Sequence, residues 1–125
     1  MRHILLILCA LALFCCASAT QNKRARTAQN IITAEEIAQS TAKNAYEAVQ
    51  LLRPNLLRIR GSRGRGVALT PLVYLDNIEF GQTGSLRDIP SHSIKEIRFL
   101  GAADATIRFG SNNMAGAFLV TSKTN

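Results

Sequence analysis

The apolar residues of the first ordered part of the chain recur with a helical period. Thr33 is a predicted helix N-cap, because its hydroxyl can accept from the amide of Glu36 while the Glu36 carboxylate reaches back to the cap. Asn44, with Glu47 three residues on, predicts a second helix start. The apolar face of this second helix runs up to Pro54, which ends it. The pattern therefore predicts two short helices.

Further along the chain the period changes to two. "LLRIRG" alternates apolar and basic residues and predicts a strand that closes at Gly61. Residues 72–75 are a continuous apolar run, which is typical of a central strand covered on both faces. Asp76 and Asn77 predict a two-residue hairpin turn, since both tolerate left-handed conformations, and residues 78–80 would be the returning strand.

The last third of the chain predicts a strand, a helix and a final strand. "SIKEIRFL" has strand character, and residues 102–109 carry apolar side chains at helical spacing. Gly110 is a natural end for that helix, and "AGAFLVTSK" predicts the closing strand. The fold class expected from this order is a small α/β domain with a mixed β-sheet and short helices.

The N-terminal residues have the pattern of a secretory signal. Arg2 precedes an apolar run over residues 4–16, and small residues ending at Ala19 supply a cleavage site. We expect residues 1–19 to be a signal peptide. An alternative route makes Cys16 a lipidated N-terminus, and the sequence leaves both open. In both cases the chain is expected to be exported.

Composition then limits what the exported part can do. The three cysteines all lie in the leader, so cleavage after Ala19 leaves no thiol for disulfides or metals. Loss of Arg2 lowers the formal charge from +7 to +6, which favours anionic partners. Residues 20–30 are polar and predict a flexible tether, residues 31–125 are long enough for one domain, and no transmembrane helix is expected after processing.

From about residue 31 to residue 123 the chain resembles the plug domain of TonB-dependent outer-membrane receptors. The resemblance runs through "LLRP", "IRG", "PLVYLDN" and "IKEIRFLGAADATIRFGSNNMAGAFLVTSK", and the last of these is the most specific. It implies a plug-like fold and a location in the periplasm or the outer membrane of a Gram-negative type of envelope. No catalytic residues and no cofactors are expected. The positions that match the plug pattern are Arg60, Gly61, Tyr74, Asp76, Asn77, Ile94, Ile97, Phe109, Gly110 and Gly116.

The chain also departs from the family pattern. Asn77 stands where the family's turn usually has glycine, and Ala117 replaces a frequent second glycine beside Gly116. The resemblance to these receptors would imply a barrel of about 22 strands after the plug. Those strands alone would need roughly 200 residues, whereas the whole chain has 125. The nearer resemblance is to small exported plug-like proteins without a barrel, so a transport cycle is not carried over.

Residues for catalysis or metal binding are few. His92 is the only histidine beyond the leader, and Ser91, His92 and Asp88 could form a nucleophile set only within one turn, whereas such triads are assembled across a fold. One histidine with scattered carboxylates does not predict a metal site. Tyr74 and Asp76 could contact a ligand at a strand end, but the favoured interpretation places Tyr74 in the core and Asp76 on the turn amides.

A cluster of arginines is the sharpest local charge feature. Its members are Arg53, Arg58, Arg60, Arg63 and Arg65. Arg58, Arg60, Arg63 and Arg65 could bind phosphates of anionic lipid head groups, with lipopolysaccharide as the best candidate. No aromatic residue interleaves, so nucleic acid is not expected as a partner. A solvated strand face is the simpler explanation.

These observations favour a non-catalytic envelope protein. Its plug-like domain would bind another protein or an envelope component, with an outer-membrane barrel made by another chain as one candidate. Exposed sheet edges are the expected means of binding. The alternative function is a basic anion-binding module that acts through the Arg/Gly loop.

Overall fold

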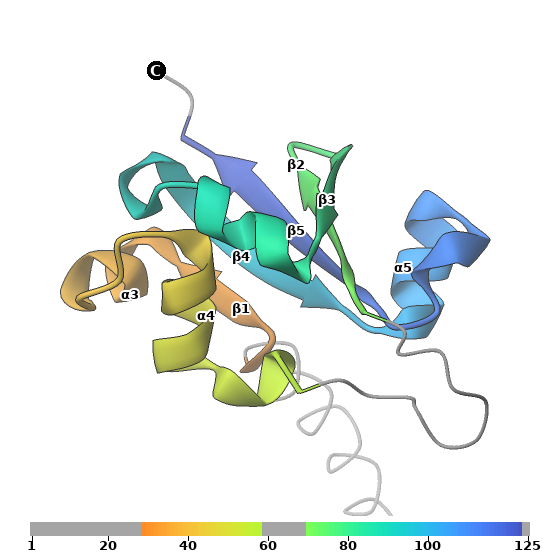
Figure 1. Ribbon diagram of the computed structural model, residues 1–125, viewed down its shortest axis with the longest axis horizontal. Coiled ribbons are helices and arrows are strands. Elements are labelled where there is room, and N and C mark those ends of the chain that lie inside the picture. The colour runs from red at the N-terminus through yellow and green to blue at the C-terminus, as the bar shows by residue number, and fades with distance from the viewer. Residues whose placement is uncertain (1–28, 59–69, 124–125) are drawn as a thin grey trace, which may run out of the picture.

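The computed structural model describes residues 29–58 and 70–123, and these form a mixed five-stranded sheet with helices on both faces (Figure 1). In chain order the strands are β1 (Ile31–Thr33), β2 (Leu72–Leu75), β3 (Ile78–Gln82), β4 (Ile94–Leu100) and β5 (Ala117–Ser122). Their order across the sheet is β1-β4-β5-β2-β3. The predicted small α/β fold with a mixed sheet is confirmed.

Strand direction decides which ends of the chain segments meet. β2 pairs with β5 in parallel, and the other three pairings are antiparallel. β1, β2 and β5 therefore enter the sheet from one end, and β3 and β4 enter from the other. At the first end Leu100 pairs with Ala117, which in turn pairs with Leu72.

β5 is the central strand, and its side chains alternate between two separate cores. Phe118 and Val120 belong to the larger core, whereas Ala117 and Leu119 belong to the smaller one. Successive side chains of a strand point to opposite faces of a sheet. Because both faces are covered here, β5 reads in the sequence as an unbroken apolar run.

The larger core lies under four helical segments. They are α3 (Ala34–Gln39), α4 (Ala45–Leu52) and the 3₁₀ helices η2 (Pro54–Leu56) and η3 (Thr83–Asp88). Val49 of α4 and Leu86 of η3 are fully buried in the same cluster as Ile97 and Phe118. Figure 1 shows α3 and α4 beside β1, on the opposite side of the picture from α5.

The smaller core is closed by α5 (Ala102–Phe109) and η5 (Ser111–Asn113) on the other face of the sheet. The ring of Phe109 stacks on the ring of Tyr74 with centroids 3.8 Å apart. The Tyr74 hydroxyl also donates to Oδ1 of the buried Asn113, at 3.2 Å. Elsewhere on this face β4 carries a partly exposed ion pair between Glu96 and Arg98.

Both predicted helix starts are present with their predicted bonds. The amide of Glu36 donates to Oγ1 of Thr33, and the amide of Thr33 donates back to Oε2 of Glu36 at 3.0 Å. The amide of Glu47 donates to Oδ1 of Asn44 at 2.9 Å. Gly110 ends α5 at φ 95° and ψ 179°, and its amide donates to the Thr106 carbonyl.

The structure corrects the sequence-based description in three places. β1 precedes the first helix where no strand was predicted, and Asn30, assigned to the tether, accepts from the Phe99 amide at 2.8 Å. Leu57 and Arg58 form a bend rather than the start of a strand, and residues 59–61 lie outside the described part. The returning strand β3 extends beyond Phe80 to Gln82.

Candidate functional site

The sheet has two edges, and β1 forms one of them. β1 is three residues long, and the amide of Thr33 is already bonded to Oε2 of Glu36. Arg53 donates from Nη2 to the other oxygen, Oε1, at 2.8 Å. The Thr33 amide first, and Arg53 second, lower the pKa of Glu36. The carboxylate therefore stays ionised at neutral pH and available to both donors.

β3 forms the other edge, and it is open as far as residues 29–58 and 70–123 show. Among these residues it pairs with β2 on one side only. Ile78 is 74% exposed and Phe80 is 43% exposed, and Glu79 between them is exposed as well. An outer strand offers a row of unpaired backbone donors and acceptors. β3 thus combines free backbone groups with exposed apolar side chains.

The β2–β3 turn is fixed from two directions. Asp76 and Asn77 have φ of 50° and 70°, as a two-residue hairpin with right-handed strand twist requires. The Asp76 carboxylate accepts from the Ser122 amide at 2.9 Å and from the Ser122 hydroxyl at 2.6 Å. Oδ1 of Asn77 accepts from Arg108 at 2.7 Å. The turn therefore presents β3 in one position.

These bonds correct the expected role of Asp76. Its carboxylate holds the end of β5, not the amides of its own turn. The Ser122 hydroxyl, followed by the Ser122 amide, lowers the pKa of Asp76. Tyr74 lies in the core, 5% exposed, as the favoured interpretation held.

The other positions of the plug pattern lie in the core or at chain reversals. Ile94 and Ile97 are buried in β4 and belong to the larger core. Gly116 has φ 90°, and a Cβ placed there would lie 2.6 Å from the Leu100 carbonyl oxygen. These residues therefore stabilise the fold, and they are not part of the exposed β3 edge. Arg60 and Gly61 are outside the described residues.

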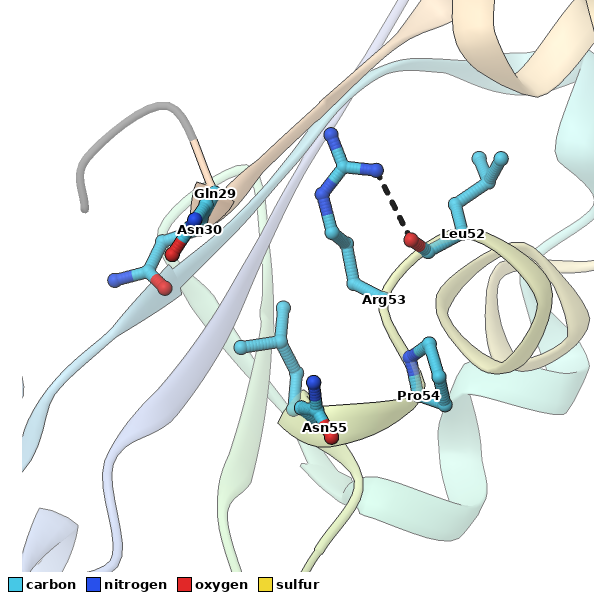
Figure 2. A pocket seen from close by; sticks show the side chains of 7 residues that line it. Gln29, Asn30, Leu52, Arg53, Pro54 and Asn55 are labelled. Carbon is cyan, nitrogen blue, oxygen red and sulfur yellow. Dashed lines mark hydrogen bonds between the residues drawn. The ribbon is translucent and has the colours of Figure 1, made fainter. Parts of the chain in front are cut away.

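A polar pocket of about 340 Å³ lies where β1 begins, between Asn30 and the end of α4 (Figure 2). The Arg53 guanidinium extends into this space and donates to the Leu52 carbonyl at 3.0 Å and to Glu36 at 2.8 Å. Arg53, counted with the arginine cluster from the sequence, is thus bonded to Glu36 and the end of α4 beside β1.

The rest of the arginine cluster is described only at Arg58, which is exposed. Arg63 and Arg65, like Arg60, lie outside the described residues, so their role in anion binding stays a prediction.

The formal charge is unevenly distributed along the sequence. Residues 1–28 contain four Lys or Arg and residues 59–69 contain three, with no Asp or Glu in either segment, so these seven equal the whole formal charge of +7. The described residues carry no net charge, with eight basic and eight acidic side chains.

No catalytic or metal-binding arrangement is present in the part of the chain that the structure describes. Ser91 and His92 lie in η4 (Ser91–Ser93), Asp88 ends η3, and none of the side-chain hydrogen bonds among residues 29–58 and 70–123 joins the three. Over the same ranges no group of three His, Cys, Asp or Glu side chains could hold a metal ion. None of the helices described has the length and apolar character to cross a membrane.

Comparison with known proteins gives one distant relative and one structural neighbour. No protein-family model matches the chain. The TonB-dependent receptor P26 of Formosa agariphila is 34% identical over 70 residues, which is 56% of this chain and 7% of that receptor. The siderophore receptor PirA from Acinetobacter baumannii aligns with a TM-score of 0.48 and 15% identity, over 75% of this chain and 17% of that one. The chain is distantly similar to part of a TonB-dependent receptor and spans a small fraction of its length.

Proposed function

We propose that the chain is a non-catalytic, plug-like recognition domain of the cell envelope that binds a partner protein through the open sheet edge at β3. The similarity to a TonB-dependent receptor supports the plug-like assignment. The exposure of β3, with Ile78 and Phe80 outward, is the observation that carries the binding role. The partner is an envelope protein, for which a barrel made by another chain is one candidate.

The chemistry of such binding is the addition of a strand. In a two-residue hairpin the pair that flanks the turn, here Leu75 and Ile78, is hydrogen-bonded, so the backbone groups of Glu79 point away from β2. An extended segment of the partner can pair with these groups, and its affinity comes from main-chain hydrogen bonds. Ile78 and Phe80 add apolar contacts beside the ladder. At the other edge β1 is only three residues long, and its Thr33 amide is already bonded to Glu36.

Site-specific crosslinking in the exporting cell tests this proposal. A photoreactive phenylalanine derivative replaces Glu79 on β3 or, as a matched control, Leu51 on α4, which is also exposed. We expect one discrete envelope protein to crosslink from position 79 and none from position 51. Identical products from both positions, or no product from position 79, would contradict the proposal.

A pair of charge substitutions on β3 then tests whether the partner binds at the β3 edge itself. Ile78→Lys with Phe80→Lys places two cations on β3, the device by which natural edge strands resist pairing. We expect the crosslink from position 79 to fall at least about tenfold, since each lost strand contact weakens a modest interface. Leu51→Lys should leave it unchanged. A crosslink that survives the double substitution would mean that the partner contacts another surface.

A further inference from the structure

The connection between β4 and β5 carries an exposed apolar surface that neither core uses. Ile107 on α5 is 85% exposed, and Met114, just after η5, is 68% exposed. They line an open hollow of about 520 Å³. The other residues of this hollow are Ala102, Ala103, Thr106 and Ser111. We call these six residues the α5–η5 surface.

This connection is made at the end of the sheet where β1 and β2 begin. β4 ends at Leu100, α5 follows at once, and η5 leads into Ala117, which pairs with both Leu100 and Leu72. By the register of β1 with β4, Gln29 is next to this same row. Three strand spacings of about 4.8 Å separate β1 from β2, roughly 14 Å. Figure 1 shows β2 beginning next to α5, at the end of the sheet away from the C-terminus.

All the excess charge of the chain is attached here. Residues 1–28 join the domain at Gln29, and residues 59–69 rejoin it at Thr70, just before β2. These two segments hold the seven basic residues that make the net charge, and all of them except Arg2 lie beyond the expected cleavage site after Ala19, whereas the described domain is neutral. The α5–η5 surface therefore follows β4 at the same end of the sheet as Gln29 and Thr70, the two points where the basic segments are attached to an uncharged domain.

We propose that the α5–η5 surface docks on an anionic lipid surface. Ile107 and Met114 would enter the boundary between head groups and acyl chains, the depth at which peripheral helices bury apolar side chains. The attached basic segments would add the attraction of Lys and Arg to anionic head groups, which acts over about a Debye length. Charge complementarity favours an anionic lipid surface, because the sequences of the two attached segments contain Lys and Arg but no Asp or Glu.

Tryptophan fluorescence can report this docking directly, because the chain contains no tryptophan. Ile107→Trp places a single reporter on the α5–η5 surface of the full chain. Leu51→Trp is the matched control, since Leu51 is 56% exposed on α4, which covers the opposite face of the sheet. Each variant is mixed with vesicles of equal parts phosphatidylglycerol and phosphatidylcholine, with and without brominated acyl chains.

The proposal predicts that the emission of the Ile107→Trp variant shifts to the blue and is quenched by brominated lipid, while the emission of the Leu51→Trp variant does neither. Both variants carry the same N-terminal segment, so insertion of that segment into the vesicles cannot by itself produce a difference between their spectra. The shift in the Ile107→Trp variant should weaken at high salt and with vesicles of phosphatidylcholine only. Equal quenching in the two variants, or vesicle binding that leaves the Ile107→Trp variant unquenched, would overturn the proposal.

Affinity measurements complete the test. Ile107→Ser with Met114→Ser removes two apolar side chains and should weaken binding to the anionic vesicles by roughly tenfold or more. Leu51→Ser should change it by less than about twofold. Affinities that are the same for the wild type and both variants would also overturn the proposal, because the apolar surface would then play no part.

Discussion

Asp76 connects the β2–β3 turn to the end of β5, two parts of the chain that are 46 residues apart. Its backbone is left-handed, with φ 50°, and its carboxylate accepts both bonds from Ser122. These bonds lower the pKa of Asp76. A lowered folded pKa adds stability above the unfolded pKa, and that stability is lost as the pH falls through the folded pKa.

Asp76→Asn isolates this electrostatic contribution, because asparagine also tolerates a left-handed backbone. At neutral pH we expect the free energy of unfolding to fall by about 0.5–1 kcal/mol, a small value because the side chain is exposed. The difference from the wild type should vanish at pH well below the usual carboxyl range, where Asp76 is protonated in both states. Urea denaturation at the two pH values measures this, and a difference that persists in acid would show that shape, not charge, is responsible.

Gly116 is required by space as well as by backbone conformation. A Cβ there would lie 2.6 Å from the Leu100 carbonyl oxygen and 2.7 Å from Cζ of Phe99, at φ 90°. Gly116→Ala should therefore lower the free energy of unfolding by about 2–5 kcal/mol, from overpacking and a strained backbone together.

Gly84→Ala is the matched control for that substitution. A Cβ at Gly84 meets nothing within 4 Å, so its effect should stay within about 0.5 kcal/mol. Thermal melting of both variants makes the comparison. Equal melting temperatures would mean that the β4–β5 contact at Gly116 is looser than described.

At the scale of elements, the parts with strong local signals were predicted well. The capping pairs at Thr33 and Asn44 marked both helix starts, because a cap is a contact between residues three apart. The turn at Asp76 and Asn77 marked the hairpin, and the unbroken apolar run at residues 72–75 marked β2 as an inner strand. β5 was predicted as a strand, but not as the central one.

The elements that were missed depend on distant partners. β1 has only three residues, and it exists because Ile31–Thr33 pairs with β4 more than sixty residues later. The short 3₁₀ helices have no period long enough to read in a sequence. At Leu57 and Arg58 the alternation of apolar and basic residues indicated a strand, but the chain bends there after η2. The local sequence pattern does not predict elements that depend on contacts between distant residues.

α5 is the element most easily separated from the rest. It is held by the buried Ala105 and by the stacking of Phe109 on Tyr74. Phe109→Ala should lower the free energy of unfolding by about 2–3 kcal/mol, less than for a fully buried ring because Phe109 is half-buried. Amides of α5 should exchange faster while those of β5 keep their protection. Equal acceleration in both would show that α5 and the sheet open as one unit.

At the scale of the whole molecule, strand order creates the candidate binding edge. The sequence indicated exposed sheet edges but not which strands would form them. The order of strands across the sheet, β1-β4-β5-β2-β3, differs from their order along the chain and is set only by folding. Nor did the sequence show that Glu36 bonds both the Thr33 amide of β1 and Arg53, because Glu36 and Arg53 are 17 positions apart. The candidate site is thus a property of topology: the sequence predicted a strand at residues 78–80, but the exposure of Ile78 and Phe80 follows from the position of β3 at the edge.

The division of charge is likewise a property of the whole chain. The sequence showed a basic protein, and the structure shows which part is basic: the described domain is neutral, and the excess lies in residues 1–28 and 59–69. A neutral domain with one open edge suits strand pairing with a protein, because no net repulsion has to be overcome. The basic segments are attached at the end that carries the α5–η5 surface.

Residue-resolved hydrogen exchange of the isolated full chain tests the central claim, that β5 is the middle of the sheet and β3 is its open edge. We predict that the amides of Phe118 and Val120 exchange only through global unfolding, whereas the outward amide of Glu79 exchanges faster by at least about a hundredfold. Protection at Glu79 equal to that in β5 would contradict the claim, because the edge would already be covered.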